Sequence, residues 1–174
     1  MTVAGVSLVL GGARSGKTAR ALALAATPPH VYLATAQALD GEMEARIAAH
    51  RLERGATWEV AEEPLEIAAA LRAVADPATT VLVDCLTLWL SNLMHHGRDI
   101  EAETTRLIEA LGEAPNRVIL VSNEIGLGLV PMEKLSRDFR DAQGRLNQRI
   151  AAAATHVEFV TAGLPLTLKG DRHP

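Results

Sequence analysis

The sequence predicts an α/β fold of three layers, in which a mostly parallel central sheet is flanked by helices on both faces. Short, β-rich apolar runs alternate with longer segments of helical periodicity along the 174 residues. This alternation is typical of strand–helix–strand units, which place their strands parallel. The apolar runs are also nearly continuous, as expected for strands that are covered on both faces.

Five runs have the composition of strands, namely VSLVL (6–10), VYLAT (31–35), TVLVD (80–84), RVILVS (117–122) and HVEFVT (156–161). Helical periodicity is found at about 16–26, 41–54, 64–75, 86–96, 101–113 and 133–154. The tail KGDRHP is expected to be irregular. Because no internal repeat or long linker interrupts the pattern, we predict a single domain over residues 1–174.

Composition limits the classes of function. The chain is 48% apolar and 22% charged, and its formal net charge of −4 argues against nucleic-acid binding, which requires a basic face. No apolar run approaches the roughly 18 residues that span a bilayer, and the N-terminal run leads into GGARSGKT, unlike a signal peptide. We therefore expect a cytoplasmic protein without nucleic-acid partners or stable membrane insertion. The single cysteine, Cys85, excludes an intramolecular disulfide and is expected to be buried.

The stretch GGARSGKT carries the clearest functional signal. Gly11, Gly16, Lys17 and Thr18 satisfy the phosphate-loop (P-loop) pattern G-x-x-x-x-G-K-[ST], between a predicted strand and a predicted helix. The glycines allow backbone N–H groups to turn toward phosphate oxygens, and the helix adds the positive end of its dipole. Lys17 is expected to reach the β- and γ-phosphates and Thr18 to ligate Mg²⁺, so the pattern predicts a bound nucleoside triphosphate with Mg²⁺.

A second metal ligand is expected at the end of a neighbouring strand. Asp84 directly follows the run TVLV. Asp is also a favoured N-cap residue, so Asp84 can alternatively cap the helix expected from Leu86. Because a P-loop needs an acidic metal partner, we favour the metal role.

The chain lacks the marks of two other classes of nucleotide-binding protein. It has no base-reading N-K-x-D motif of a GTPase switch, and neither a second basic domain nor the aromatic platform of a helicase. A compact phosphoryl- or nucleotidyl-transferase remains.

The segment GEMEARIAAHRLERG (41–55) contains a candidate nucleophile. Met43, Ile47 and His50 share one helical face, and Arg46 and Arg54 lie one turn to either side of His50. On spacing alone, this is a histidine packed beside apolar neighbours. Nearby cations, however, favour the neutral imidazole, whose lone pair can attack phosphorus and carry the group covalently.

The segment ILVSNEIGLGLVP (119–131) delivers Asn123 and Glu124 to the carboxyl end of a strand, where ligands bind in open α/β sheets. Glu124 can act as a general base for an acceptor hydroxyl, or it can hydrogen-bond the glycine-containing loop that follows.

In order and spacing, the stretches GGARSGKT, YLATAQ, EMEARIAAHR, VDCLTLWLSNL, VSNEIGLGLVP and FRDAQGRLNQRIAAAA resemble the bifunctional adenosylcobinamide kinase / adenosylcobinamide-phosphate guanylyltransferase family of cobalamin biosynthesis. The resemblance implies a RecA-like P-loop NTPase fold and a homotrimer whose neighbouring subunits border the site. It implies phosphorylation of the aminopropanol hydroxyl of adenosylcobinamide by a nucleoside triphosphate. Transfer of GMP from GTP to adenosylcobinamide phosphate would follow, through a GMP–histidine intermediate.

The same resemblance makes His50 the guanylylated histidine. The candidate catalytic residues are then His50, Lys17 and Glu124, with Mg²⁺ at Thr18 and Asp84 and with GTP and ATP as substrates. The implied nucleotide contacts are Gly11, Gly12, Ala13, Arg14, Ser15, Gly16, Lys17, Thr18, Ala34, Thr35, Ala36, Arg51, Leu52, Glu53, Arg54, Glu62 and Asp84. Two alternatives remain: a guanylyltransferase that lacks the kinase step, and a nucleotide-binding regulatory protein. Sequence does not decide between ATP and GTP as the phosphate donor.

Several other residues are interpreted structurally. His95 and His96 are expected to end a helix, where imidazoles suit the dipole. Met94 is expected in the core or at a subunit contact rather than on a corrinoid-binding surface. Arg137 and Arg140 are expected on a mainly solvated helix face, where the resemblance implies one or two phosphate or interface contacts.

Overall fold

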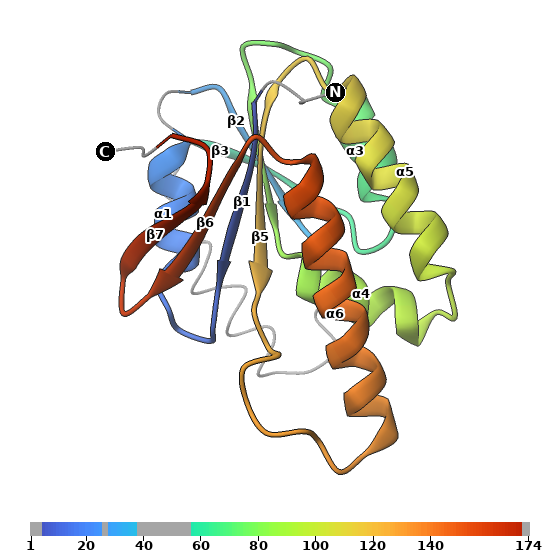
Figure 1. Cartoon of the computed structure of the whole chain (residues 1–174). Coiled ribbons are helices and arrows are strands. Elements are labelled where there is room, and N and C mark those ends of the chain that lie inside the picture. Colours follow the sequence, from blue (N-terminus) through green and yellow to red (C-terminus); the bar gives the residue numbers. More distant parts are fainter. Residues whose placement is uncertain (1–4, 26–27, 38–56, 172–174) are drawn as a thin grey trace.

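The computed structural model describes residues 5–25, 28–37 and 57–171. The central feature is a seven-stranded sheet in the order β3-β2-β4-β5-β1-β6-β7 (Figure 1). Six strands run parallel, and β7 pairs antiparallel with β6. The strands are β1 (Val6–Gly11), β2 (His30–Ala34), β3 (Trp58–Glu62), β4 (Thr80–Asp84), β5 (Arg117–Asn123), β6 (His156–Thr161) and β7 (Leu164–Lys169).

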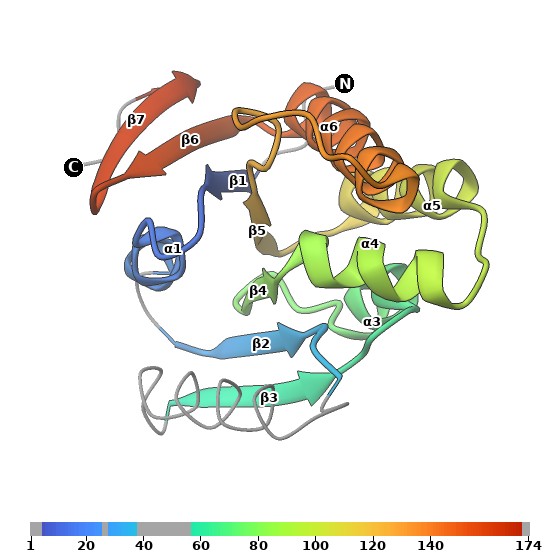
Figure 2. The same ribbon diagram turned by 90° about the horizontal axis from the view of Figure 1, so that it is seen from below.

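Helices cover both faces of the sheet, which confirms the predicted three-layer α/β fold. Viewed along the strands, α1 lies on one face, and α3, α4, α5 and α6 lie on the other (Figure 2). None of the helices formed by the described residues is long and apolar enough to cross a membrane. The helices are α1 (Lys17–Leu24), α3 (Ile67–Ala73), α4 (Leu86–His95), α5 (Ile100–Glu113) and α6 (Lys134–Ala153).

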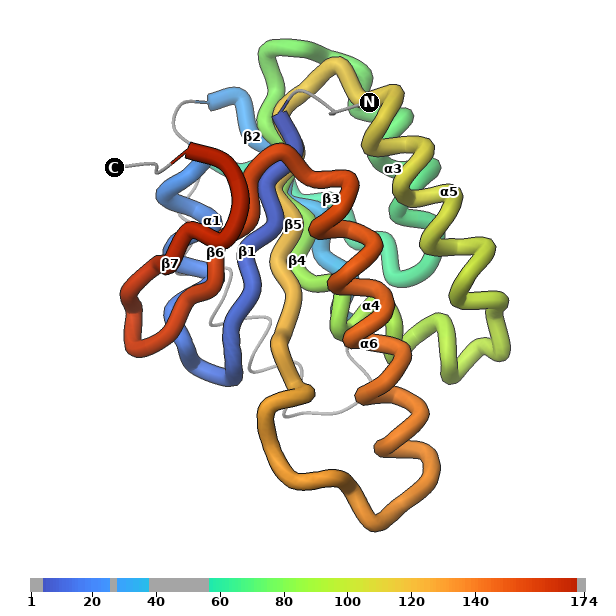
Figure 3. The backbone as a smooth tube through the Cα atoms, viewed as in Figure 1, coloured from blue at the N-terminus to red at the C-terminus, as the bar shows by residue number. Residues whose placement is uncertain are grey.

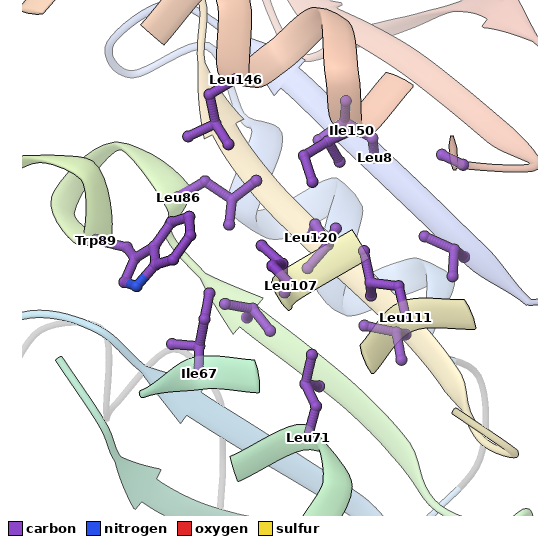
Figure 4. Close-up of a cluster of buried hydrophobic side chains, with 14 of the residues drawn as sticks. Leu8, Ile67, Leu71, Leu86, Trp89, Leu107, Leu111, Leu120, Leu146 and Ile150 are labelled. Carbon is purple, nitrogen blue, oxygen red and sulfur yellow. The ribbon is translucent and has the colours of Figure 1, made fainter. Parts of the chain in front are cut away.

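Alternating strand residues build a core on each side of the sheet. Leu8 of β1 joins the larger cluster beneath α3 to α6, whereas the next residue, Val9, faces the smaller cluster beneath α1. Trp89 of α4 is buried in the larger cluster (Figure 4), and its indole N–H donates to the carbonyl of Leu65 at 2.8 Å. Both faces of the central parallel strands β2, β4, β5 and β1 are thus largely closed to solvent, as their continuous apolar runs predict.

Two strands were not expected from the sequence, β3 and β7, and both lie at an edge of the sheet. The side chains of β3 are half-buried or exposed, so WEVAE lacks the continuous apolar run of a central strand. The sequence of β7, LPLTLK, contains Pro165, which is tolerated on an edge strand but argues against a central one. Lys169 ends β7, so the tail that was expected to be irregular begins one residue later than predicted.

The expected helix over 64–75 is shorter than predicted and begins at Ile67. The Glu63 carboxylate accepts the backbone N–H groups of Leu65 and Glu66 at 2.9 and 2.8 Å and holds this stretch in a turn. The other described helices begin and end close to their expected ranges. The expected helix over 41–54 lies outside the described residues.

The parallel strands all end on the same side of the sheet, the side where their carboxyl ends lie. In the register of the sheet, Gly11 of β1 lies beside Asn123 of β5, and Asp84 of β4 lies beside Ala34 of β2. The turn between β6 and β7 lies on this same side, next to the loop between β1 and α1 (Figure 3). Motifs far apart in sequence therefore meet there.

Candidate functional site

The P-loop follows β1 and leads into α1. Gly16 is the N-cap residue, with φ of +94°, a left-handed conformation that favours glycine. Lys17, the first helical residue, folds back so that its Nζ donates to the carbonyl of Gly12 at 3.0 Å. Burial lowers the pKa of Lys17 from its usual value, while the negative charge of Asp84 opposes this shift. The ammonium group is thus held over the loop, where a phosphate would sit.

The hairpin of β6 and β7 packs tightly against the P-loop. The N–H of Gly163 donates to the carbonyl of Ser15 at 2.8 Å. A Cβ on Gly16 would lie 3.1 Å from the Cα of Gly163. A Cβ on Gly11 would lie 2.4 Å from Ser15 Oγ and 2.6 Å from the carbonyl oxygen of Val160. Glycine at position 11 is therefore required by crowding from within the loop and from β6.

The Asp84 carboxylate joins the P-loop helix to the centre of the sheet. Its Oδ2 accepts the Tyr32 hydroxyl at 2.6 Å and the Thr18 hydroxyl at 3.3 Å. The N-cap residue of α4 is Cys85 and not Asp84, so the carboxylate is directed to the P-loop side. Cys85 is buried as expected, and burial raises the pKa of its thiol to about 11, which leaves it protonated at neutral pH.

The strand ends beside Asp84 place the other expected nucleotide contacts. Ala34 pairs with Asp84 on one side and with Glu62 on the other, and Glu62 is exposed. Thr35 is fully buried, and its hydroxyl accepts the N–H of Cys85 at 2.9 Å and donates to the Cys85 carbonyl at 2.8 Å. The Thr35 side chain therefore joins the ends of β2 and β4, and contact with a nucleotide is left to the backbone of this segment.

Glu124 lies directly beside the P-loop. Its N–H donates to the carbonyl of Gly11 at 3.1 Å, and its Oε1 accepts the N–H of Gly126 at 2.5 Å. Glu124 thus makes the hydrogen bond to the loop that follows it, which is one of the two roles expected for this residue. The preceding residue is held by α6, since Asn147 Nδ2 donates to the carbonyl of Asn123 at 3.0 Å.

A buried ion pair fixes α1 to β6. Arg20, one turn into α1, donates through Nε and Nη2 to the two carboxylate oxygens of Glu158, both at 2.8 Å. The Glu158 side chain is 1% exposed and also lies 3.0 Å from His156 Nε2. The hydrogen bond from Arg20 is the main cause that holds the pKa of Glu158 below its usual value.

The candidate nucleophile lies outside the described residues. His50 and the expected nucleotide contacts Arg51, Leu52, Glu53 and Arg54 all fall in the range 38–56. The described residues therefore bring Asp84 and Glu124 to the P-loop and place Ala34 and Glu62 at the ends of the next two strands, β2 and β3. The placement of the 41–54 segment stays a prediction.

Sequence reasoning missed Tyr32, Arg20, Glu158 and Gly163. A signal exists for Glu158, because a carboxylate within an otherwise apolar strand is almost never fully buried without a partner. Tyr32 is the single tyrosine of the chain and lies two residues before the end of its strand. Nothing local indicates Gly163, whose role depends on the turn that places it against the P-loop.

Comparison with known structures shows the same fold in two proteins of low sequence identity. A KaiC-like protein from Pyrococcus horikoshii is 15% identical with a TM-score of 0.51, covering 89% of this chain and 70% of that one. The P4 protein of bacteriophage phi6, solved in complex with ADP, is 15% identical with a TM-score of 0.52, covering 92% and 52%. At this identity the likeness shows the fold alone, that of P-loop NTPases.

The family model described as cobinamide kinase / cobinamide phosphate guanyltransferase matches residues 7–168. The chain belongs to this family. The bifunctional adenosylcobalamin biosynthesis protein CobP of Pseudomonas aeruginosa is 52% identical to this family member over 168 residues, 94% of this chain and 97% of that protein. The bifunctional adenosylcobalamin biosynthesis protein CobU of Escherichia coli is 40% identical over 178 residues, 93% and 98% of the two chains. The resemblance found in the sequence is thus confirmed over nearly the full length.

The crowding at Gly11 predicts that alanine lowers the free energy of unfolding more at position 11 than at position 12. We expect Gly11→Ala to lower the free energy of unfolding by about 1–3 kcal/mol, because the new methyl group overlaps Ser15 Oγ and the Val160 carbonyl. The matched control is Gly12→Ala, whose Cβ would meet nothing within 4 Å, with an expected change within about 0.5 kcal/mol. Urea unfolding of both variants measures the difference, and equal losses would contradict the crowding.

The buried pair of Arg20 and Glu158 predicts a pH-dependent stability. Glu158→Gln should cost about 3 kcal/mol at neutral pH, since it removes the buried carboxylate charge that faces Arg20. Because the folded pKa of Glu158 lies below its usual 4.5, the stabilisation is complete above that pH. It should be lost as the pH falls through the lowered pKa.

Urea titrations of wild type and variant from pH 7 to pH 3 test this. The control is Glu113→Gln, which removes one partner of the exposed pair with Arg72 and should cost less than about 1 kcal/mol. A pH-independent difference between wild type and Glu158→Gln would show that the ion pair is not its source.

Proposed function

We propose that this chain phosphorylates the aminopropanol hydroxyl of adenosylcobinamide with a nucleoside triphosphate. It then transfers GMP from GTP to the new phosphate, giving adenosylcobinamide-GDP and pyrophosphate. The observation that carries the proposal is the convergence of Lys17, Thr18 and Asp84 at the P-loop. The family description, which names both a kinase and a guanyltransferase, supports the pairing of two reactions.

In the first reaction, the P-loop residues Gly11 to Thr18 would hold the triphosphate. Their backbone N–H groups and the N-terminus of α1 attract the phosphate oxygens. Lys17 exchanges its hydrogen bond to Gly12 for the β- and γ-phosphates. The acceptor oxygen bonds to the γ-phosphorus, the bond to the bridging oxygen breaks, and the nucleoside diphosphate leaves. Glu124, which lies beside the P-loop, is the candidate base that takes the hydroxyl proton.

Thr18 and Asp84 fit a Mg²⁺ ion that accompanies the nucleotide. Both side chains offer oxygen, the ligand that Mg²⁺ prefers, and the Thr18 hydroxyl keeps lone pairs for a cation while it donates to Asp84. Among the described residues, no group of three or more His, Cys, Asp or Glu is placed to hold a metal. The ion would therefore be shared with the nucleotide, where it neutralises charge that develops on the phosphates.

In the second reaction, His50 is the proposed nucleophile. Its ring nitrogen bonds to the α-phosphorus of GTP as the bond to pyrophosphate breaks. The phosphate oxygen of the acceptor then attacks the same phosphorus, and the P–N bond returns its electrons to the imidazole. Support comes from the family and from the histidine in ARIAAHR. We propose further nucleotide contacts at Arg51 to Arg54, Ala34 to Ala36 and Glu62.

The subunit assembly and the cellular compartment are inferred as well. We propose a homotrimer of one-domain subunits that acts in the cytoplasm without nucleic acid. The family match over residues 7–168 supports the single domain, and the net charge of −4 supports independence of nucleic acid. Exposed leucines on β7, at positions 164, 166 and 168, offer apolar surface for contact between subunits.

Labelled nucleotides separate the two reactions. With α-labelled GTP and Mg²⁺, the denatured protein should carry an acid-labile label, and His50→Ala should carry none, because a P–N bond is cleaved in acid. The exposed His96→Ala is the matched control and should label as wild type does. With γ-labelled ATP or GTP, label should pass to cobinamide. Guanylylation without this transfer would indicate an enzyme that lacks the kinase step, and binding without either would indicate a regulatory protein.

The metal role of Asp84 predicts a second result. We expect Asp84→Asn to lower the kinase kcat by about a hundredfold and to raise the Mg²⁺ concentration required for half-maximal rate, since it removes the negative charge beside Thr18. Asp138→Asn, an exposed acid paired with Lys134 on α6, is the control and should leave both unchanged. An unaltered Mg²⁺ dependence in Asp84→Asn would remove Asp84 from the metal site.

A further inference from the structure

A large cavity lies beside the P-loop on the side of the sheet that carries α4 and α6. Its volume is about 680 Å³, and its walls come from the end of α4, the segment after β5 and the start of α6. These two helices lie on the same face of the sheet (Figure 2). A cavity of this size falls within the range of small-molecule sites.

The walls combine a broad apolar surface with a few hydrogen-bonding groups. The apolar side chains are Met94, Ile125, Pro131, Leu135 and Phe139. The polar groups are Ser91, His95, Ser136 and Arg140. The described lining contains no carboxylate. Met94, expected in the core or at a subunit contact, packs against the core and also faces this cavity.

The segment after β5 is held in place as a wall by two arginines of α6. Arg137 Nη1 donates to the carbonyl of Pro131 at 3.0 Å, and Arg140 Nη1 donates to the carbonyl of Leu129 at 3.2 Å. These residues were expected on a mainly solvated helix face, but their guanidinium groups instead fix the backbone that encloses the cavity.

One wall of the cavity is joined through the chain to the proposed phosphate site. Ile125 directly follows Glu124, whose N–H is bonded to Gly11 of the P-loop. On the opposite wall, α4 begins two residues after Asp84, and with a rise of about 1.5 Å per residue Ser91 lies about 8 Å further along. His95 lies about 14 Å from the start of the helix on the same basis. A ligand body in the cavity is therefore separated from the phosphates by about one extended side arm.

We propose that this cavity holds the corrin body of the acceptor, with its aminopropanol arm directed past Glu124 toward Lys17. This inference rests on the proposed function and adds a location to it. A corrin ring has a broad, largely apolar face with carboxamide arms at its rim, which matches apolar walls with a few donors and acceptors at their edge. The distance along α4 also suits an acceptor whose bulky body lies far from its reacting hydroxyl.

A bulky side chain placed in the cavity tests whether the corrin body binds there. Ser136 is exposed on the first turn of α6, so Ser136→Trp adds bulk without disturbing the core. We expect it to raise the KM for cobinamide at least about tenfold while the KM for ATP or GTP stays within about twofold. Leu135→Gln, whose wild-type side chain is 69% exposed, should weaken cobinamide binding in the same direction. Gln148→Trp, exposed on the same helix away from the cavity, is the matched control.

Three measurements distinguish the outcomes: steady-state kinetics, titration calorimetry with cobinamide alone, and light scattering for the oligomeric state. Weaker cobinamide binding in Ser136→Trp and Leu135→Gln, with normal nucleotide binding, supports the cavity. A normal cobinamide KM in both variants overturns it, while the proposed function stands. A change of oligomeric state that accounts for the altered KM also overturns it, because the face would then bind a second copy. Failure of the wild type to phosphorylate or bind cobinamide overturns the function and the location together.

Discussion

The carboxylate of Asp84 is the contact on which the arrangement of the site depends. It accepts hydrogen bonds from Tyr32 of β2 and Thr18 of α1, and it stands at the end of β4. Three separate elements, β2, α1 and β4, are thereby joined at one carboxylate. The hydrogen bond from the Tyr32 hydroxyl also helps to orient this carboxylate.

The P-loop is held from two further directions, so the phosphate site is preorganised. On one side, Glu124 donates to Gly11 from the end of β5; on the other, Gly163 donates to Ser15 from the last hairpin. The pair of Arg20 and Glu158 fixes the first turn of α1 to β6. Such support limits reorganisation when phosphates bind, which is how enzymes use fixed dipoles to stabilise charge. The proposed site of the acceptor lies in a separate region, the cavity walls built by α4 and α6.

The sequence predicts the central part of the fold and the P-loop well, because both have strong local signals. The five buried strands have continuous apolar runs, and GGARSGKT places its glycines and lysine by spacing alone. The edge strands were missed, since WEVAE and LPLTLK face solvent and lack that pattern. Long-range partners such as Gly163 and Tyr32 could not be found for a different reason. Their contacts are fixed by the sheet order, which no single segment encodes. The same holds for Arg137 and Arg140, whose charge suggested solvent although their hydrogen bonds shape a wall.

The place of β1 in the sheet has a consequence for how the molecule is made. β1 precedes the other described strands in the chain, yet its two neighbours in the sheet are β5 and β6, more than a hundred residues later. Gly163, which supports the P-loop, belongs to a hairpin within the last twenty residues. The phosphate loop therefore precedes in the chain the strands that support it, and it acquires these supports only after β5, β6 and β7 have been made. A nascent chain released early would carry the complete motif without the structure that gives it a shape.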